Sequence, residues 1–187
     1  MKLTIFCFFI CPLCFLSCHE RPGIEKDIED LFEKPVHLHL DQMECLGRHL
    51  PDKVCTLSTV LKLVVYSDST MCTSCGIKKL HTWDNLFQKM RKYEGRLKVY
   101  FIFAPSIEKK RNLQIMVKNY LSDTPIYIDT ANVFLRSNPH IPDFPEIHTF
   151  LLDEKDSVIL VGSPLKNGKM EVLFWQTVKE RIGKSRN

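Results

Sequence analysis

Apolar, β-rich runs alternate with amphipathic stretches along most of this chain, and this alternation restricts the fold more than any other feature. The runs 61–66, 97–104 and 125–129 are rich in the aliphatic and aromatic residues typical of buried strands. Between them, in 72–93 and 106–121, apolar residues recur every three or four positions, as on one face of a helix. Strands that alternate with helices pair in parallel through right-handed crossovers. The sequence therefore predicts an α/β fold.

The last part of the chain predicts antiparallel strands as well. Two short apolar runs, 148–152 and 158–161, flank the tight turn 153–156, which is the pattern of a hairpin. A final amphipathic helix is expected over 170–182, and the alternating segment 36–40 predicts a half-buried strand ahead of the central ones. We therefore expect a mixed sheet with helices on both of its faces.

The N-terminus has the pattern of an export signal. Lys2 is followed by an almost unbroken apolar run, Leu3 to Leu16, which is shorter than the about 20 residues that span a bilayer. The junction Phe15-Leu16-Ser17-Cys18 resembles a bacterial lipobox, whose cysteine carries the lipid. This resemblance implies a lipoprotein signal peptide over 1–17 and lipidation of Cys18. Ordinary secretory cleavage nearby and an uncleaved anchor are the alternatives.

The rest of the chain is expected to form a tether followed by one domain. Residues 18–35 are polar and predict the tether, with a short helix near 24–32. Residues 36–187 predict the domain, with irregular chain over 41–60, because the length of 187 residues is ordinary for a single core. The formal net charge of +4 is too small to indicate nucleic acid as a partner.

The tetrapeptide Cys72-Thr73-Ser74-Cys75 lies between an apolar strand and an amphipathic helix. In the first turn of a helix the main-chain N–H groups lack partners and the helix dipole is positive, so a thiolate is stabilised there. The spacing of three residues places both sulfurs on one helical face. We therefore expect Cys72 to be the exposed nucleophile and Cys75 to be the sheltered thiol that resolves a mixed disulfide.

The order of strand, Cys-x-x-Cys, helix, strand, helix, strand, hairpin and helix resembles the thioredoxin fold. Within that fold it is similar to the TlpA/ResA-like exported thiol–disulfide oxidoreductases, through residues 36–40, Pro125–Asp129 and the hairpin from Thr149 to Gly162. The resemblance covers about residues 36–183 and implies a thioredoxin-like mixed sheet. It also implies an anchored, periplasm-facing protein of the cell envelope that acts on exported protein thiols or disulfides, with a membrane or periplasmic redox donor. No cofactor and no metal are expected.

Several positions differ from the pattern of that family. Tyr66 stands where the family often has a buried acid, six residues before the first cysteine. Met71 stands in place of a Trp, and Thr73-Ser74 in place of Gly-Pro or Pro-Pro. Most important, His148 replaces the cis-proline that faces the cysteines. We interpret Tyr66 as a core residue rather than a catalytic one.

His148 is the third catalytic candidate, because its position matches a residue that faces the cysteine pair. When protonated there, it favours the thiolate of Cys72. The alternative is a histidine that only packs at the start of a strand. Asp68 is expected to form a turn, with tuning of the cysteine pair as the alternative. The residues expected to contact substrate flank the cysteines and His148: Met71, Thr73, Ser74, Ile147 and Thr149.

Further cysteines and histidines lie between the expected tether and this motif or close to it. Cys45 and Cys55 predict a structural disulfide, and a second redox pair that exchanges with the first is the alternative. His37 and His39 fall on the polar face of their segment. We interpret them as exposed residues, with metal ligation as the alternative.

Two other functions remain open at the level of sequence. Cys72, Cys75 and His148 offer the soft sulfur and nitrogen ligands of a copper-binding protein that resembles the Sco group, although that group spaces its cysteines by three residues. The chain is alternatively a non-catalytic envelope domain in which Cys72 and Cys75 form an inert disulfide. A thiol–disulfide oxidoreductase remains the leading hypothesis.

Overall fold

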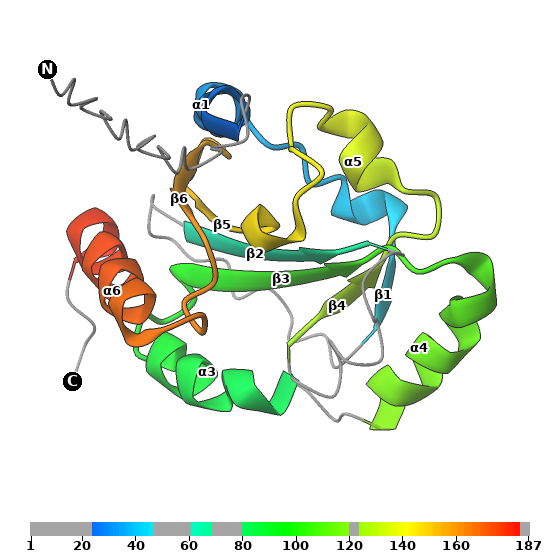
Figure 1. Cartoon of the computed structure of the whole chain (residues 1–187). Coiled ribbons are helices and arrows are strands. Elements are labelled where there is room, and N and C mark those ends of the chain that lie inside the picture. The colour runs from blue at the N-terminus through cyan, green and yellow to red at the C-terminus, as the bar shows by residue number, and fades with distance from the viewer. Residues whose placement is uncertain (1–23, 47–60, 69–79, 120–123, 184–187) are drawn as a thin grey trace, which may run out of the picture.

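Six strands form one mixed sheet in the order β1-β4-β3-β2-β5-β6 (Figure 1). The computed structural model describes residues 24–46, 61–68, 80–119 and 124–183, and the structural statements below concern these residues. The strands are β1 Glu44–Leu46, β2 Leu61–Ser67, β3 Leu97–Phe103, β4 Ile126–Ile128, β5 Thr149–Leu152 and β6 Val158–Val161.

The centre of the sheet is parallel and its flanks are antiparallel. β2 pairs with β3 in parallel from Leu61 opposite Leu97 to Ser67 opposite Phe103, and β4 extends the parallel part on the far side of β3. β5 is antiparallel to both β2 and β6, while β1 is antiparallel to β4. The predicted strands 61–66, 97–104 and 125–129 and the predicted hairpin are therefore confirmed.

Helices cover both faces of the sheet, as expected. They are α1 Ile24–Glu33, α3 Asp84–Arg91, α4 Ile107–Asn119, α5 Val133–Ser137 and α6 Gly168–Ile182. Figure 1 shows α3 and α6 on one side of the sheet and α1 and α5 on the other. Leu86 of α3 and Phe174 of α6 belong to one apolar cluster, whereas Leu31 of α1 and Phe134 of α5 belong to a second. None of the helices in the described part of the chain is long and apolar enough to cross a membrane.

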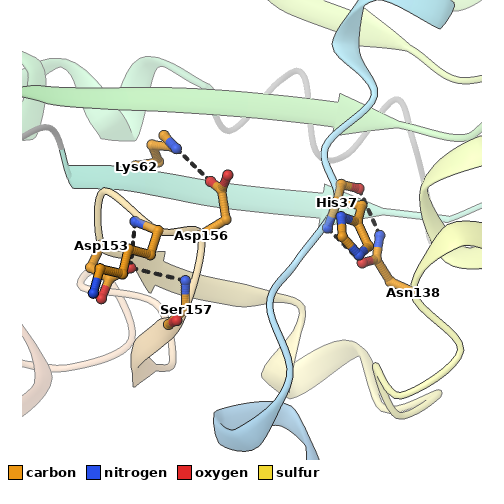
Figure 2. A network of polar contacts seen from close by, with 7 residues as sticks. His37, Lys62, Asn138, Asp153, Asp156 and Ser157 are labelled. Carbon is orange, nitrogen blue, oxygen red and sulfur yellow. Dashed lines mark hydrogen bonds and ion pairs between the residues drawn. The ribbon is translucent and has the colours of Figure 1, made fainter.

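The strand predicted over 36–40 is wrong. The alternation itself is real, because Val36 is fully buried while His37 and His39 are exposed. However, the Asn138 side chain takes the place of a neighbouring strand: its Oδ1 accepts from His37 N–H at 2.7 Å, and its Nδ2 donates to the His37 carbonyl at 2.8 Å (Figure 2). His39 then adopts the left-handed conformation with φ of 46°, which ends the extended run.

The strand at this end of the chain lies further along than expected. A 3-10 turn, Leu40–Gln42, follows His39 and leads into β1, which falls inside the region 41–60 expected to be irregular. The helix expected near 24–32 is confirmed as α1. It lies within the predicted tether, and Leu31 on it is fully buried, so side-chain packing extends back at least to this residue.

Two acidic residues within the turn between β5 and β6 stabilise it. Asp153 Oδ1 accepts the N–H groups of Lys155 and Ser157, each at 2.9 Å (Figure 2). Asp156 adopts a positive φ of 62° and forms an ion pair with Lys62 of β2 at 2.5 Å. Its carbonyl also accepts the N–H of Val36. The turn therefore ties the N-terminal segment to the sheet.

Candidate functional site

The carboxyl end of β2 is held between two neighbouring segments. The carbonyl of Ser67 accepts the N–H of Ala104, just beyond β3, at 2.8 Å. On the other side, Tyr66 N–H donates to the carbonyl of His148 at 2.9 Å. The chain leaves this end of β2 through Asp68, which is buried. His148 therefore lies beside this strand end, and its expected place facing the cysteine pair stays a prediction.

The cysteine motif itself lies outside the described residues. Asp68 precedes it and Leu80 follows it as the nearest described positions. The expected roles of the residues between them therefore remain predictions: Met71, Cys72, Thr73, Ser74 and Cys75. The same applies to Cys18 and the export signal.

His148 is buried, with 1% of its side chain exposed. Its Nε2 lies 2.9 Å from the carbonyl oxygen of Pro142. A carbonyl only accepts hydrogen bonds, so Nε2 carries the proton in the neutral imidazole and Nδ1 holds the lone pair. Among the described residues Nδ1 has no hydrogen-bond partner. The ring therefore has one nitrogen engaged in holding the loop and a second nitrogen able to accept a proton.

Tyr66 packs its ring against His148 and Phe134, with ring centroids 5.3 Å and 5.0 Å apart. Its hydroxyl donates to Asn132 Oδ1 at 3.2 Å. Burial raises the pKa of Tyr66 well above its ordinary value, and the carboxylates of Asp68, Asp129 and Asp143 raise it further. Tyr66 is therefore a neutral hydrogen-bond donor at neutral pH, in agreement with its interpretation as a core residue.

Asp129 is a buried acid whose role is to begin a helix. Its two carboxylate oxygens accept the N–H groups of Val133 and Phe134, each at 2.8 Å, in the first turn of α5. This satisfies donors that a helix start otherwise leaves unpaired. The helix in turn presents Phe134 to Tyr66 and Phe150, so Asp129 supports the packing behind His148.

Sequence reasoning did not identify Asn132 or the Pro142 carbonyl as contacts of this site. Asn132 bonds Tyr66 from a left-handed backbone conformation with φ of 52°, which asparagine tolerates better than most residues. The Pro142 carbonyl has no side-chain signature at all. The only sequence signal in this region was the concentration of prolines over 139–145, which predicted a loop.

Ile147 and Thr149 flank His148 and are each partly exposed, whereas the predicted cysteine pair and histidines at 37–55 lie away from this strand end or beyond the described residues. Cys45 is half-buried; burial raises the pKa of its thiol, and a hydrogen bond with Tyr127 partly opposes that shift. Cys55 lies outside the described residues, so the disulfide stays a prediction. His37 and His39 are exposed, as expected. In the described ranges, no three His, Cys, Asp or Glu side chains gather as around a metal ion.

Comparisons with known proteins found matches among solved structures. No family model matches the chain, and no curated protein matches it. A thioredoxin-like protein from Porphyromonas gingivalis is 12% identical, with a TM-score of 0.46, over 68% of this chain and 79% of that one. A Chlorobium tepidum protein described as a thiol:disulfide interchange protein DsbE is 17% identical, with a TM-score of 0.43, over 64% and 77%. The bacterioferritin comigratory protein of Xanthomonas campestris is 12% identical, with a TM-score of 0.43, over 65% and 80%.

The fold itself follows from the topology of this chain. The parallel β2, β3 and β4, the antiparallel hairpin of β5 and β6 beside β2, and the closing helix α6 repeat the order expected from the sequence. This chain has a thioredoxin-like α/β fold.

Proposed function

We propose that this protein is a thiol–disulfide oxidoreductase of the bacterial cell envelope that acts through Cys72 and Cys75. The observation that supports it is the position of His148, whose carbonyl pairs with Tyr66 at the end of β2. Cys72 follows Asp68 by four residues, and four residues of extended chain span at most about 14 Å. The proposal therefore requires that Cys72 reacts within about 14 Å of Asp68, at the end of β2 beside which the buried His148 lies.

The proposed exchange conserves atoms and electrons. The Cys72 thiolate attacks one sulfur of a disulfide, that disulfide bond breaks, and one substrate thiolate leaves and takes up a proton. Cys75, as a thiolate, then attacks the sulfur of Cys72, closes the Cys72–Cys75 disulfide and releases the second substrate thiol. Two electrons pass from the protein dithiol to the substrate. A reduced dithiol partner of the envelope returns them, and the reverse sequence oxidises a substrate.

His148 is proposed to receive the proton that Cys72 gives up. Its Nε2 is engaged with the Pro142 carbonyl, so the available atom is Nδ1, which has no partner among the described residues. Transfer of the thiol proton to Nδ1 leaves a thiolate beside an imidazolium, and this pairing is the arrangement that activates cysteine nucleophiles. The Pro142 carbonyl continues to accept from Nε2 after that transfer and keeps the ring in place.

The direct test is an exchange assay with cysteine variants of the full chain. We expect Cys72→Ser to abolish reduction of insulin and of small disulfides, and Cys75→Ser to accumulate a mixed disulfide that mass spectrometry detects. Cys45→Ser is the matched control and retains activity. Equal rates for the unchanged protein and Cys72→Ser would reject the proposal and favour a non-catalytic domain. Stoichiometric binding of Cu(I) without exchange activity would favour the copper-binding alternative.

The location is a separate part of the proposal. The lipobox-like junction supports lipidation of Cys18, which anchors the domain to a membrane on its periplasmic side. In cells fed a labelled fatty acid, the protein is expected to carry the label, and Cys18→Ala is expected to lose it. Retention of the label by that variant would exclude Cys18 as the lipidated residue.

A further inference from the structure

The last helix, α6, carries apolar side chains on two opposite faces. Its inner face packs Phe174, Val178 and Ile182 into the core, and these residues recur every four positions. On its outer face Val172 is 67% exposed and Leu173 is 44% exposed. Packing of the domain therefore explains the inner face and leaves two aliphatic side chains of the outer face in contact with solvent.

Positive side chains surround this exposed pair. Lys169 precedes Val172 by three residues and Lys179 follows it by seven, and these spacings share one face of an α-helix. Both lysines are exposed. Lys166, in the turn before the helix, and Arg181, in its last turn, are exposed as well. The aliphatic pair therefore lies among four exposed bases.

The acidic side chains of the described stretch 163–183 do not cancel this charge. Glu171 forms an ion pair with Lys89 of α3, with 2.6 Å between Oε1 and Nζ, so its charge is already balanced. Glu180 Oε1 accepts from Gln176 Nε2 at 3.0 Å, which leaves its negative charge in place. The four exposed bases and Glu180 together carry a net charge of +3. The outer face of α6 is therefore complementary to an anionic surface.

Helix α6 also lies at the end of the sheet to which the N-terminal segment leads. α1 packs against the edge strand β6 from one face, and α6 covers the other face (Figure 1). Met170 of α6 packs against Gly162, directly after β6. Ile24 begins α1, and the six residues 18–23 span at most about 20 Å. A lipid on Cys18 therefore holds this end of the sheet close to the membrane.

We infer that the outer face of α6 docks on the surface of a membrane that contains anionic phospholipids. Aliphatic side chains enter the boundary between headgroups and acyl chains, while lysines reach the phosphates. A protein partner matches this face less well, because protein interfaces are enriched in aromatic residues and arginine and depleted in lysine. The inference goes beyond the exchange chemistry and shares with the proposed function only the location at a membrane.

A photoactivatable phospholipid identifies the residues that touch the membrane. The full chain is mixed with vesicles of phosphatidylglycerol and phosphatidylcholine that contain a diazirine-labelled phospholipid, irradiated and digested with trypsin. We expect the label in peptide 170–179, which contains the exposed pair. Peptide 112–118 of α4 contains Ile115, which is 50% exposed, and is the internal control. If 170–179 carries no more label than 112–118, the inference is overturned, whatever the N-terminal segment binds.

The charge and the apolar contact are tested separately. On vesicles of phosphatidylcholine alone, the label in 170–179 is expected to fall about fivefold or more, because the bases lose their anionic partners. On the anionic vesicles, Leu173→Ser is expected to lower it by about the same factor, whereas Ile115→Ser leaves it unchanged. Equal labelling on both kinds of vesicle, or unchanged labelling of Leu173→Ser, overturns the inference. Neither result depends on thiol exchange or on lipidation, so the proposed function is tested independently.

Discussion

The two faces of the sheet are packed in different ways. On the face covered by α3 and α6, regular helices contribute apolar side chains such as Leu86, Met90 and Phe174 to a continuous cluster. On the face covered by α1 and α5, much of the cover is irregular chain, and three buried polar side chains lie among the apolar ones: Asp129, Asn138 and His148. Each of these three bonds main-chain groups: Asp129 those of the first turn of α5, Asn138 those of His37, and His148 the carbonyl of Pro142.

This difference explains why buried polar side chains collect on one face of the sheet. A helix satisfies its own main-chain groups, so the face it covers needs only apolar side chains. Loops leave main-chain groups unpaired, and buried polar side chains must satisfy them. The face covered by loops therefore accumulates polar side chains, and one of them, His148, retains a nitrogen without a partner in the described part of the chain.

The largest expected effect tests the helical face. Phe174→Ala removes a fully buried ring from α6 and is expected to lower the free energy of unfolding by about 4 kcal/mol. Val172→Ala, on the same helix but 67% exposed, is expected to change it by less than about 0.5 kcal/mol. Urea unfolding of both variants measures these free energies. A small loss in Phe174→Ala would mean that this cluster contributes less than its burial indicates.

A smaller effect is expected on the face covered by loops. Asn138→Ala leaves three main-chain groups without their partner, namely the N–H and C=O of His37 and the C=O of Phe134. We expect a loss of about 2 kcal/mol in the free energy of unfolding. Asn138→Asp keeps the acceptor for His37 N–H but places a buried carboxylate oxygen against the carbonyls of His37 and Phe134, so its loss is expected to exceed that of Asn138→Ala. Equal stability of all three proteins would show that water replaces these contacts without cost.

The smallest expected effect is a pH dependence of the folding stability, caused by His140 on the same face. Burial lowers the pKa of His140; Lys34 and His37 lower it further, and Asp30 opposes them. The folded protein therefore resists protonation of this ring, whereas the unfolded chain takes up the proton near the ordinary histidine value of about 6.5. Stability is fully present above that pH and is lost as the pH falls below it.

This dependence can be separated from that of the other histidines. Urea unfolding between pH 7.5 and pH 5, values chosen to bracket about 6.5, is expected to show a shallower loss of stability in His140→Gln. His81→Gln changes an exposed histidine on the α3 side and serves as the control. If the loss of stability with falling pH is unchanged in His140→Gln but reduced in His81→Gln, the pH dependence arises at His81 and the prediction is wrong.

The candidate site was predictable to the extent that it depends on strand order. Because strands that alternate with helices pair in parallel, and the hairpin returns beside the first of them, the start of β5 must meet the end of β2. The sequence matched His148 to a family position that faces the cysteine pair, and the structure adds its contact with Tyr66. Asn132 and the Pro142 carbonyl could not be found in the same way, since no periodic pattern governs loop conformation.

Sequence alone determined β2 to β6 and the presence of helices on both faces, because apolar periodicity and chain order are properties of the chain itself. Only the tertiary structure decided how 36–40 is held and which nitrogen of His148 is engaged. In each case the deciding partner is remote in the chain or is a main-chain atom, as with Asn138 for His37 and Pro142 for His148. A hydrogen bond to a main-chain carbonyl leaves no trace in the identity of the residue that provides it.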